Sequence, residues 1–239
     1  MKKTIFISVL LACASAVVCS LILVKPSILF RNEGSIKVKG SVSQIVDSDA
    51  ASWYAEVWAN APDAQSAYKK IRQDREQLLE FLKSMGLDAS DASLNLSLRQ
   101  VFKLDKNGFQ TDEVSGYKYT LSLSYSSCDV ALVEKLSSQA SSLVEKGLSI
   151  NSNPPQYFYS KLENLKLELL AKASENAKER AKLLVAGSGA KLGKVLSASQ
   201  GVFQITGPLS TETSDYGMYD TSSRTKQVTC VVTLQFAAE

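Results

Sequence analysis

The chain has 239 residues, with 27 Lys and Arg against 24 Asp and Glu, and a net charge of +3 at pH 7. It contains no histidine, which excludes Ser-His-Asp and Cys-His catalysis, histidine-bearing metal sites and histidine-based pH sensing. Acidic and basic residues are interspersed along the chain, without the basic stripe of a nucleic-acid binder, so we expect no nucleic-acid partner. Any catalysis would have to use carboxylate, Lys, Tyr or Cys side chains.

The N-terminus predicts a membrane anchor. A pair of lysines precedes residues 4–24, which carry no charge. This run has the roughly 20-residue length of a spanning helix, whereas the apolar part of a secretory signal has about 7–15 residues. Cleavage at the small residues 12–16 would leave an apolar new terminus, so we favour an uncleaved anchor over a removed signal peptide. We expect an anchor and its flank at 1–31, in the cytoplasmic (inner) membrane, and a domain at 32–239 that faces the periplasm or exterior.

Two strands and a helix open this domain. Apolar side chains alternate over residues 35–46 and again over 51–60, which is typical of half-buried strands. A helix then begins at residues 61–63 and ends at Gly86, since apolar residues recur at helical spacing between a start signal and a glycine. Its other positions mix cations with anions, Asp74 among them, and predict a solvated face.

The middle of the chain predicts a hairpin and a second helix. Two tyrosine- and leucine-rich strands flank a polar loop with an Asn-Gly pair, which favours a tight turn. The expected elements are strands at 94–98 and 117–125, a polar loop at 105–115, a helix from Ser127 to Gly147 and a short strand at 148–152.

The C-terminal part predicts a long helix with a leucine and alanine stripe and a salt-rich outer face. Two strands follow, separated by a polar stretch with no apolar period, which we expect to be mobile. The expected elements are a helix at 161–186, strands at 194–205 and 226–236, and the polar stretch at 207–225.

The resulting order is ββα, ββα, β, a long α and ββ. Short turns between consecutive strands favour antiparallel pairing, with helices covering one face. The expected fold class is α+β, with antiparallel sheet(s) packed against three helices, preceded by an N-terminal transmembrane helix. No linker within residues 35–239 requires a second domain.

Two patterns suggest chemistry but fit simpler structures better. The stretch at 187–194 lacks the glycine and the Ser or Thr that a phosphate-binding loop requires, and it follows a helix, so it fits a helix end. Asp47 with Asp49, and Asp88 with Asp91, lie in Ser- and Ala-rich turns, where Asp is common. No catalytic, cofactor-binding or metal-binding residue is assigned.

The aromatic residues of the second strand provide the candidate interface. Trp53 and Trp58 are five positions apart and therefore lie on opposite faces of one strand. Trp53 shares the Ala and Val face and is assigned to the core. Trp58 lies with Tyr54 on the other face, where either another part of the chain covers it or a subunit or partner binds, since Trp and Tyr are enriched at interfaces.

Cysteines supply a second candidate feature. Cys128 and Cys230 lie in the exported part, where a disulfide can persist, and we consider a bond between them. The alternative for Cys230 is a small buried apolar residue, because it falls at an apolar position of a strand.

Several stretches in order resemble the SIMPL domain family. They are IKVKG at 36–40, DAASW at 49–53, LKSMGL at 82–87, ASENAKERA at 173–181, GAKLGKV at 189–195 and the closing strand at 228–236. Each is weak alone, but their order and spacing make the match fairly specific over about residues 35–236. Bacterial members are typically periplasmic, outer-membrane-associated or membrane-anchored, some form ring-like oligomers, and some are linked to oxidative-stress defence.

The resemblance implies an α+β fold and no catalytic residue that can be transferred to this chain. We therefore expect a membrane-anchored envelope protein that acts by binding or oligomeric assembly and not as an enzyme, with oxidative or envelope stress defence as the role implied by the family. The expected partners are the membrane through residues 4–24, further copies of the chain and an envelope protein of unknown identity, with no cofactor. The alternatives are an enzyme with a histidine-free pocket of carboxylate, Tyr or Lys groups, and a signalling adapter.

Overall fold

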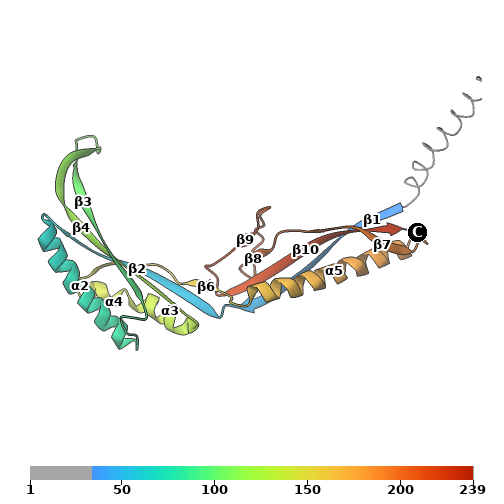
Figure 1. Ribbon diagram of the computed structural model, residues 1–239, viewed down its shortest axis with the longest axis horizontal. Helices are drawn as coiled ribbons and strands as arrows, with labels where there is room; N and C mark the ends of the chain where they lie inside the picture. The colour runs from blue at the N-terminus through green and yellow to red at the C-terminus, as the bar shows by residue number, and fades with distance from the viewer. Residues whose placement is uncertain (1–33, 239) are drawn as a thin grey trace, which may run out of the picture. The chain divides into compact units, whose positions relative to one another are not determined.

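The computed structural model describes residues 34–238, which form two compact units (Figure 1). The second unit comprises Ser43–Lys166 and Phe203–Thr229, and the first contains the rest of the described chain. This division into units does not test the predicted single domain at 32–239, which stays a prediction. Among residues 34–238, no helix is both long enough and apolar enough to cross a membrane. The predicted anchor at 4–24 lies outside the described residues.

One antiparallel sheet forms the framework of the second unit, with strand order β3-β4-β2-β5 and β6 also paired to β2. Helices α2, α3 and α4 lie on one side of strands β2 and β4 (Figure 1). The α+β class with antiparallel pairing is thereby confirmed. The elements are β2 (Ala50–Ala61), α2 (Ala64–Ser84), β3 (Ser93–Leu104), β4 (Gln110–Ser127), α3 (Val130–Gln139), α4 (Ser142–Glu145), β5 (Ser149–Ser152) and β6 (Gln156–Phe158).

Alternation along β2 places the core of this unit. Its odd-numbered side chains from Ala51 to Ala59, including Trp53, are buried against the helices, so the assignment of Trp53 to the core is confirmed. Trp53 Nε1 donates a hydrogen bond to Ser152 Oγ over 2.9 Å, which satisfies its polar atom inside the core. Helix α2 begins where the Asp63 carboxylate accepts the Ser66 N–H, and it ends before Gly86, whose φ of +83° suits glycine.

Asp74 of α2 departs from the expected solvated face. Its side chain is fully buried, and its Oδ1 accepts a hydrogen bond from Lys70 Nζ over 2.6 Å. Helical spacing places it one turn after Ile71 and one turn before Leu78, on the buried side of the helix. The charge of Asp was therefore a poor guide to its position.

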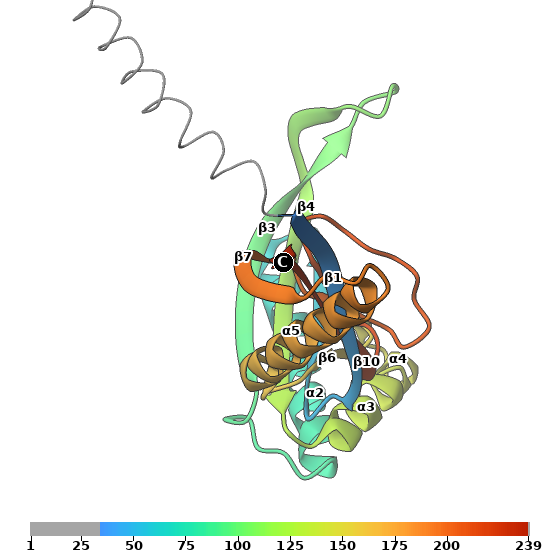
Figure 2. The same ribbon diagram turned by 90° about the vertical axis from the view of Figure 1, so that its right-hand side faces the viewer.

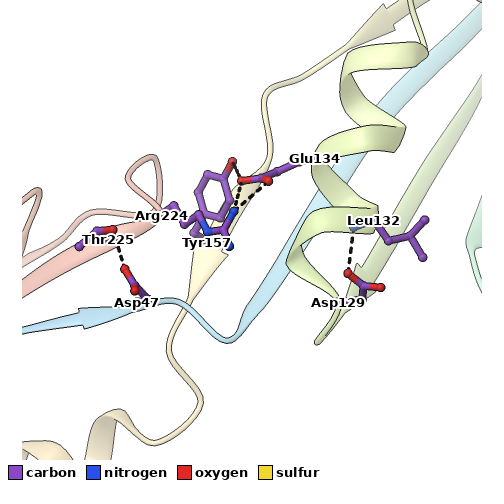
Figure 3. Close-up of polar contacts among 7 residues, drawn as sticks. All are labelled: Asp47, Asp129, Leu132, Glu134, Tyr157, Arg224 and Thr225. Carbon is purple, nitrogen blue, oxygen red and sulfur yellow. Dashed lines mark hydrogen bonds and ion pairs between the residues drawn. The ribbon is translucent and has the colours of Figure 1, made fainter.

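The second predicted helix is split and begins later than expected. Asp129, instead of Ser127, provides the cap, since its carboxylate accepts the Leu132 N–H over 3.0 Å (Figure 3). Ser127 Oγ accepts the N–H of Asp129 and so orders the residues before the helix. The helical path is interrupted at residues 140–141, which separates α3 from the single turn α4.

The hairpin of β3 and β4 is longer than the sequence predicts. Most of the expected polar loop at 105–115 is strand, and the turn itself covers only residues 105–109. The Asp105 carboxylate accepts the N–H groups of Asn107 and Phe109, and Gly108 adopts a φ of +83°. A compact turn leaves the following polar residues free to pair as a strand.

The first unit packs a helix along a sheet. In both views α5 (Leu162–Ala186) runs alongside β1 (Gly34–Asp47) and β10 (Thr225–Ala238) (Figures 1 and 2). In this unit β10 pairs antiparallel with β7 (Leu192–Gln200) and neighbours β1 in the sheet. The alanine stripe of α5 is fully buried, as its spacing predicts.

The stretch at 203–229 completes the second unit and contains more strands than the sequence predicts. The predicted strand at 194–205 is two strands, β7 and β8 (Gln204–Thr206), and β8 pairs with β10. Within the predicted polar stretch, β9 (Met218–Tyr219) pairs in parallel with β8. The Gln204 side chain donates to Ser214 O over 2.6 Å and accepts the Ser214 N–H over 3.3 Å. Hydrogen bonds of a polar side chain thus connect this segment to β8, and such contacts leave no apolar periodicity in the sequence.

Candidate functional site

The sheet face opposite the helices of the second unit carries the predicted aromatic pair. Tyr54 is 40% exposed, and Trp58 is half-buried. Both alternate with the buried odd-numbered positions of β2, so they share the face that the helices do not cover. Their neighbours on β4 across this face are Ser124 and Thr120. The structure therefore brings the two residues onto one face, which is hydroxyl-rich.

Trp58 is shielded by a cation from the adjacent strand. Lys118 Nζ lies 5.0 Å from the centre of the Trp58 ring. A partly exposed contact of this kind contributes about 0.5–1 kcal/mol. A partner that stacks on the Trp58 ring would have to displace the half-buried Lys118 side chain, and the cost is limited to this small contribution.

Tyr54 is held by polar neighbours on the same face. Its hydroxyl donates to Glu56 Oε1 over 2.6 Å and lies 3.2 Å from Ser122 Oγ. The hydrogen bond to the Glu56 carboxylate raises the pKa of Tyr54, so the phenol stays protonated and acts as a hydrogen-bond donor. These hydrogen bonds hold the Tyr54 hydroxyl in place while the residue stays 40% exposed.

A second exposed apolar feature is the hairpin arm, which we define as residues 101–116. Pairing of β2 with β4 ends at Tyr117, so within residues 34–238 the arm consists of two strands without a third. Exposed apolar side chains mark it: Val101 is 38% exposed, Leu104 66%, Phe109 70% and Val114 40%. An isolated two-stranded hairpin is marginally stable in water, so a covering partner would stabilise the arm. The sequence signal for the arm was present in Phe109 and Val114, which sit in the segment interpreted as a polar loop.

A polar cluster around Glu134 joins three segments of the second unit (Figure 3). Glu134 of α3 forms an ion pair with Arg224, whose Nη1 lies 3.0 Å from Oε2, and it also accepts the Tyr157 hydroxyl over 3.1 Å. Burial and the Glu134 carboxylate raise the pKa of Tyr157. Nearby, Thr225 Oγ1 donates to Asp47 Oδ1 over 2.6 Å. These groups satisfy one another, and the Glu134 contacts link α3 to β6 and to the residue before β10.

Lys226 is a buried amine beside this cluster. Its side chain is 1% exposed, and its Nζ donates to the carbonyl oxygens of Asp220 and Ser223. Burial lowers the pKa of Lys226, and the charge of Asp220 opposes that shift. A hollow of about 530 Å³ lies alongside, lined by Thr206, Gly207, Ser210, Glu212, Met218, Tyr219, Asp220, Ser222 and Ser223. The amine is committed to backbone carbonyls and is not directed into the hollow as a nucleophile.

The remaining candidates have structural roles. The Asp49 carboxylate accepts both the N–H and the hydroxyl of the distant Ser160, whereas Asp91 accepts the Asp88 N–H within its own turn. Gly189 has a φ of +74° directly after α5, which fits a helix end. Across the described chain, no three His, Cys, Asp or Glu side chains gather as they would around a metal ion.

Both cysteines of the candidate pair are present as thiols. Cys128 is exposed, whereas Cys230 is fully buried, and burial raises the pKa of the Cys230 thiol. The expectation that Cys230 occupies a buried apolar position is confirmed. The two residues belong to different units, and a disulfide between them stays a prediction.

These features define an α+β protein of antiparallel sheets with exposed apolar surfaces in its second unit. The family model described as "SIMPL: Protein of unknown function (DUF541)" matches residues 36–236, and the chain belongs to this family. No curated protein matches the chain. One solved structure with a partial likeness is the de novo designed protein Foldit4, at 11% identity, with 43% of this chain and 93% of that chain covered and a TM-score of 0.25.

Proposed function

We propose that this SIMPL-family protein is anchored in the cytoplasmic membrane, faces the cell exterior or periplasm, and acts by oligomeric assembly or binding instead of catalysis. The open sheet face with Tyr54 and Trp58 is the observation that carries the proposal. Aromatic side chains that are held by their own neighbours yet accessible on a sheet face lose little conformational entropy on association. Association of several copies through this face is the form of the proposal that we favour.

The hairpin arm supports the same conclusion independently. Four exposed apolar side chains on a two-stranded extension add apolar surface that a monomer leaves in water. Such surface is typical of proteins that associate. The role in oxidative or envelope stress defence rests on the family resemblance, and the anchor rests on residues 4–24.

The test is the mass of the full-length chain in mild detergent, measured by light scattering, for the wild type and Trp58→Ala. Truncation of an interface tryptophan costs on the order of 2 kcal/mol, or about thirtyfold in affinity. We therefore expect the variant to shift toward monomer at micromolar concentration while its circular dichroism stays native. The matched control is Tyr216→Ala, which removes a ring that is 97% exposed elsewhere in the second unit.

Two results would contradict the proposal. One is a wild-type chain that remains monomeric at hundreds of micromolar. The other is a Trp58→Ala variant that unfolds instead of dissociating, because Trp58 would then serve the stability of the sheet.

A further inference from the structure

Strand β3 forms an open edge of the second unit's sheet. It pairs with β4 on one side, and its other side has no strand partner within residues 34–238. An edge of this kind presents a row of backbone N–H and C=O groups to which another extended chain can bind.

The first half of this edge lacks the features that protect natural edges. Residues 93–98 read SLNLSL and contain no charge and no proline. The register shifts between β3 and β4 begin only at Val101 and Phe102. Natural proteins block their sheet edges with lysine, proline or bulges, so an unprotected edge points to pairing as its use.

An apolar groove lies beside the same edge. Leu94, Leu96 and Leu98 pair with β4 residues on the helix side of the sheet, yet Leu96 is 42% and Leu98 48% exposed. The groove has a volume of about 320 Å³ and is lined by Tyr68, Ile71, Arg72, Arg75, Leu94, Leu96 and Leu121. A strand added along β3 would place every second side chain over this groove and bury these leucines.

The charge of the groove indicates what kind of strand fits. Arg72 and Arg75 of α2 line the groove and are exposed, and none of the residues that line the groove is acidic. Neither arginine forms an ion pair with another residue in the described part of the chain. Carboxylates on an incoming strand would therefore find unpaired guanidinium groups, which bind carboxylates well.

We propose that the β3 edge and the α2 groove bind an extended segment of another protein, whose groove-facing side chains are aliphatic and acidic. The segment adds as a strand along residues 93–98. Its aliphatic side chains cover Leu96 and Leu98, and its carboxylates pair with Arg72 and Arg75. Pairing of β3 with β3 of a second copy is disfavoured, because it would bring the arginines of both copies toward one seam. This site lies on the helix side of the sheet and is separate from the Tyr54 and Trp58 face.

The probe is a fluorescently labelled synthetic peptide, Thr-Leu-Thr-Glu-Thr-Leu-Thr-Glu-Thr, titrated with the full-length chain and followed by fluorescence polarisation. We expect saturable binding that weakens at least about tenfold in the double variant Arg72→Glu/Arg75→Glu, and a peptide with Lys in place of Glu to bind that variant better than the wild type. Leu96→Gln should weaken binding similarly. Leu209→Gln, which alters a leucine that is 97% exposed elsewhere in the second unit, should leave it unchanged.

Backbone pairing is tested with two N-methylated forms of the peptide, methylated at odd or at even positions. Only one set of N–H groups faces β3, so one form should lose binding and the other retain it. Circular dichroism confirms that each variant is folded. If Leu96→Gln does not fold, the exposed arginine pair still decides the question.

The proposal is overturned by absence of saturable binding, by binding that the arginine reversal leaves unchanged, or by equal binding of both N-methylated forms. It is also overturned if Leu96→Gln lowers the oligomeric mass of the chain, because the edge would then hold a second copy. Trp58→Ala should not affect peptide binding. Failure of the peptide-binding proposal can therefore be distinguished from failure of the proposed self-association through the Tyr54 and Trp58 face.

Discussion

Asp220 is a residue whose surroundings strongly shift the ionisation of its carboxyl group. Burial alone would raise the pKa of its carboxyl group, but hydrogen bonds from Ser223 and Ser222 and the charge of Lys226 outweigh burial and hold the pKa at about 2. Ser222 contributes both its N–H and its hydroxyl, each at 2.7 Å. A folded-state pKa below the ordinary 3.8 means that this stabilisation is fully present above that value and is lost as the pH falls toward 2.

Asp220→Asn should therefore lower the free energy of unfolding by about 1–2 kcal/mol at neutral pH, since it weakens hydrogen bonds to a charged group. The difference from the wild type should shrink as the pH falls from about 4 toward 2. Urea unfolding followed by tryptophan fluorescence measures both effects. Asp215→Asn, an exposed position in the same segment, is the control. A difference independent of pH would assign the effect to packing and not to charge.

At the scale of single residues, the alternation of apolar and polar residues in the sequence predicts which side chains of a strand are buried. It correctly predicts that Trp53 and Cys230 are buried, because each lies in a long regular strand. It could not find Glu134, Tyr157 and Arg224, which meet from three segments and carry no shared period. Their association depends on chain folding over long separations in sequence.

Among the elements, the contact between β1 and α5 has the least spare room. A Cβ added to Gly40 would lie 2.1 Å from the Ala173 carbonyl oxygen and 2.6 Å from the Ala177 nitrogen. Backbone atoms cannot rotate away as a side chain can. Gly40, together with the alanines of α5, therefore sets the distance between this strand and this helix.

Gly40→Ala should destabilise the protein by about 2 kcal/mol or more, in the range of overpacked sites. Thermal unfolding followed by circular dichroism measures the loss. Gly34→Ala is a matched control in the same strand, because its added Cβ would meet nothing closer than 3.4 Å and should change the melting temperature little. Equal melting temperatures for the two variants would show that α5 moves to accommodate the methyl group.

Element prediction worked where periodicity was strong and failed where polar residues form regular structure. The strands around Trp53 and the helix after Asp63 were expected at nearly their observed bounds. The extension of β4 back to Gln110 was missed because its polar residues resemble a loop. Within the stretch at 207–225, the side-chain contacts of Gln204 and Lys226 could not be read from periodicity, and the mobility of the stretch stays a prediction.

For the whole molecule, the sequence could establish the α+β class and the antiparallel order but not the division into two units. Periodicity states which face of a strand is buried, and it does not state which strands share a sheet. β1, β10 and α5 each contribute residues to both units, so no change in composition marks the boundary. The SIMPL family match covers both units together.

The predicted anchor is tested on the intact protein. We expect the protein isolated from membranes to retain residues 4–24, because their length suits a spanning helix and the small-residue sites lie within the apolar run. N-terminal sequencing or intact mass measurement decides this. A mature chain that starts between residues 17 and 35 would exclude the anchor.

The enclosure of Lys226 has a chemical consequence. An amine that is 1% exposed and hydrogen-bonded to two backbone carbonyls is out of reach of acylating reagents while the fold around it is closed. Solvent-exposed lysines, in contrast, are modified at once. The rate at which Lys226 becomes acylated therefore reports how often the backbone at residues 220–226 opens, so the chain carries its own internal reporter of that local unfolding.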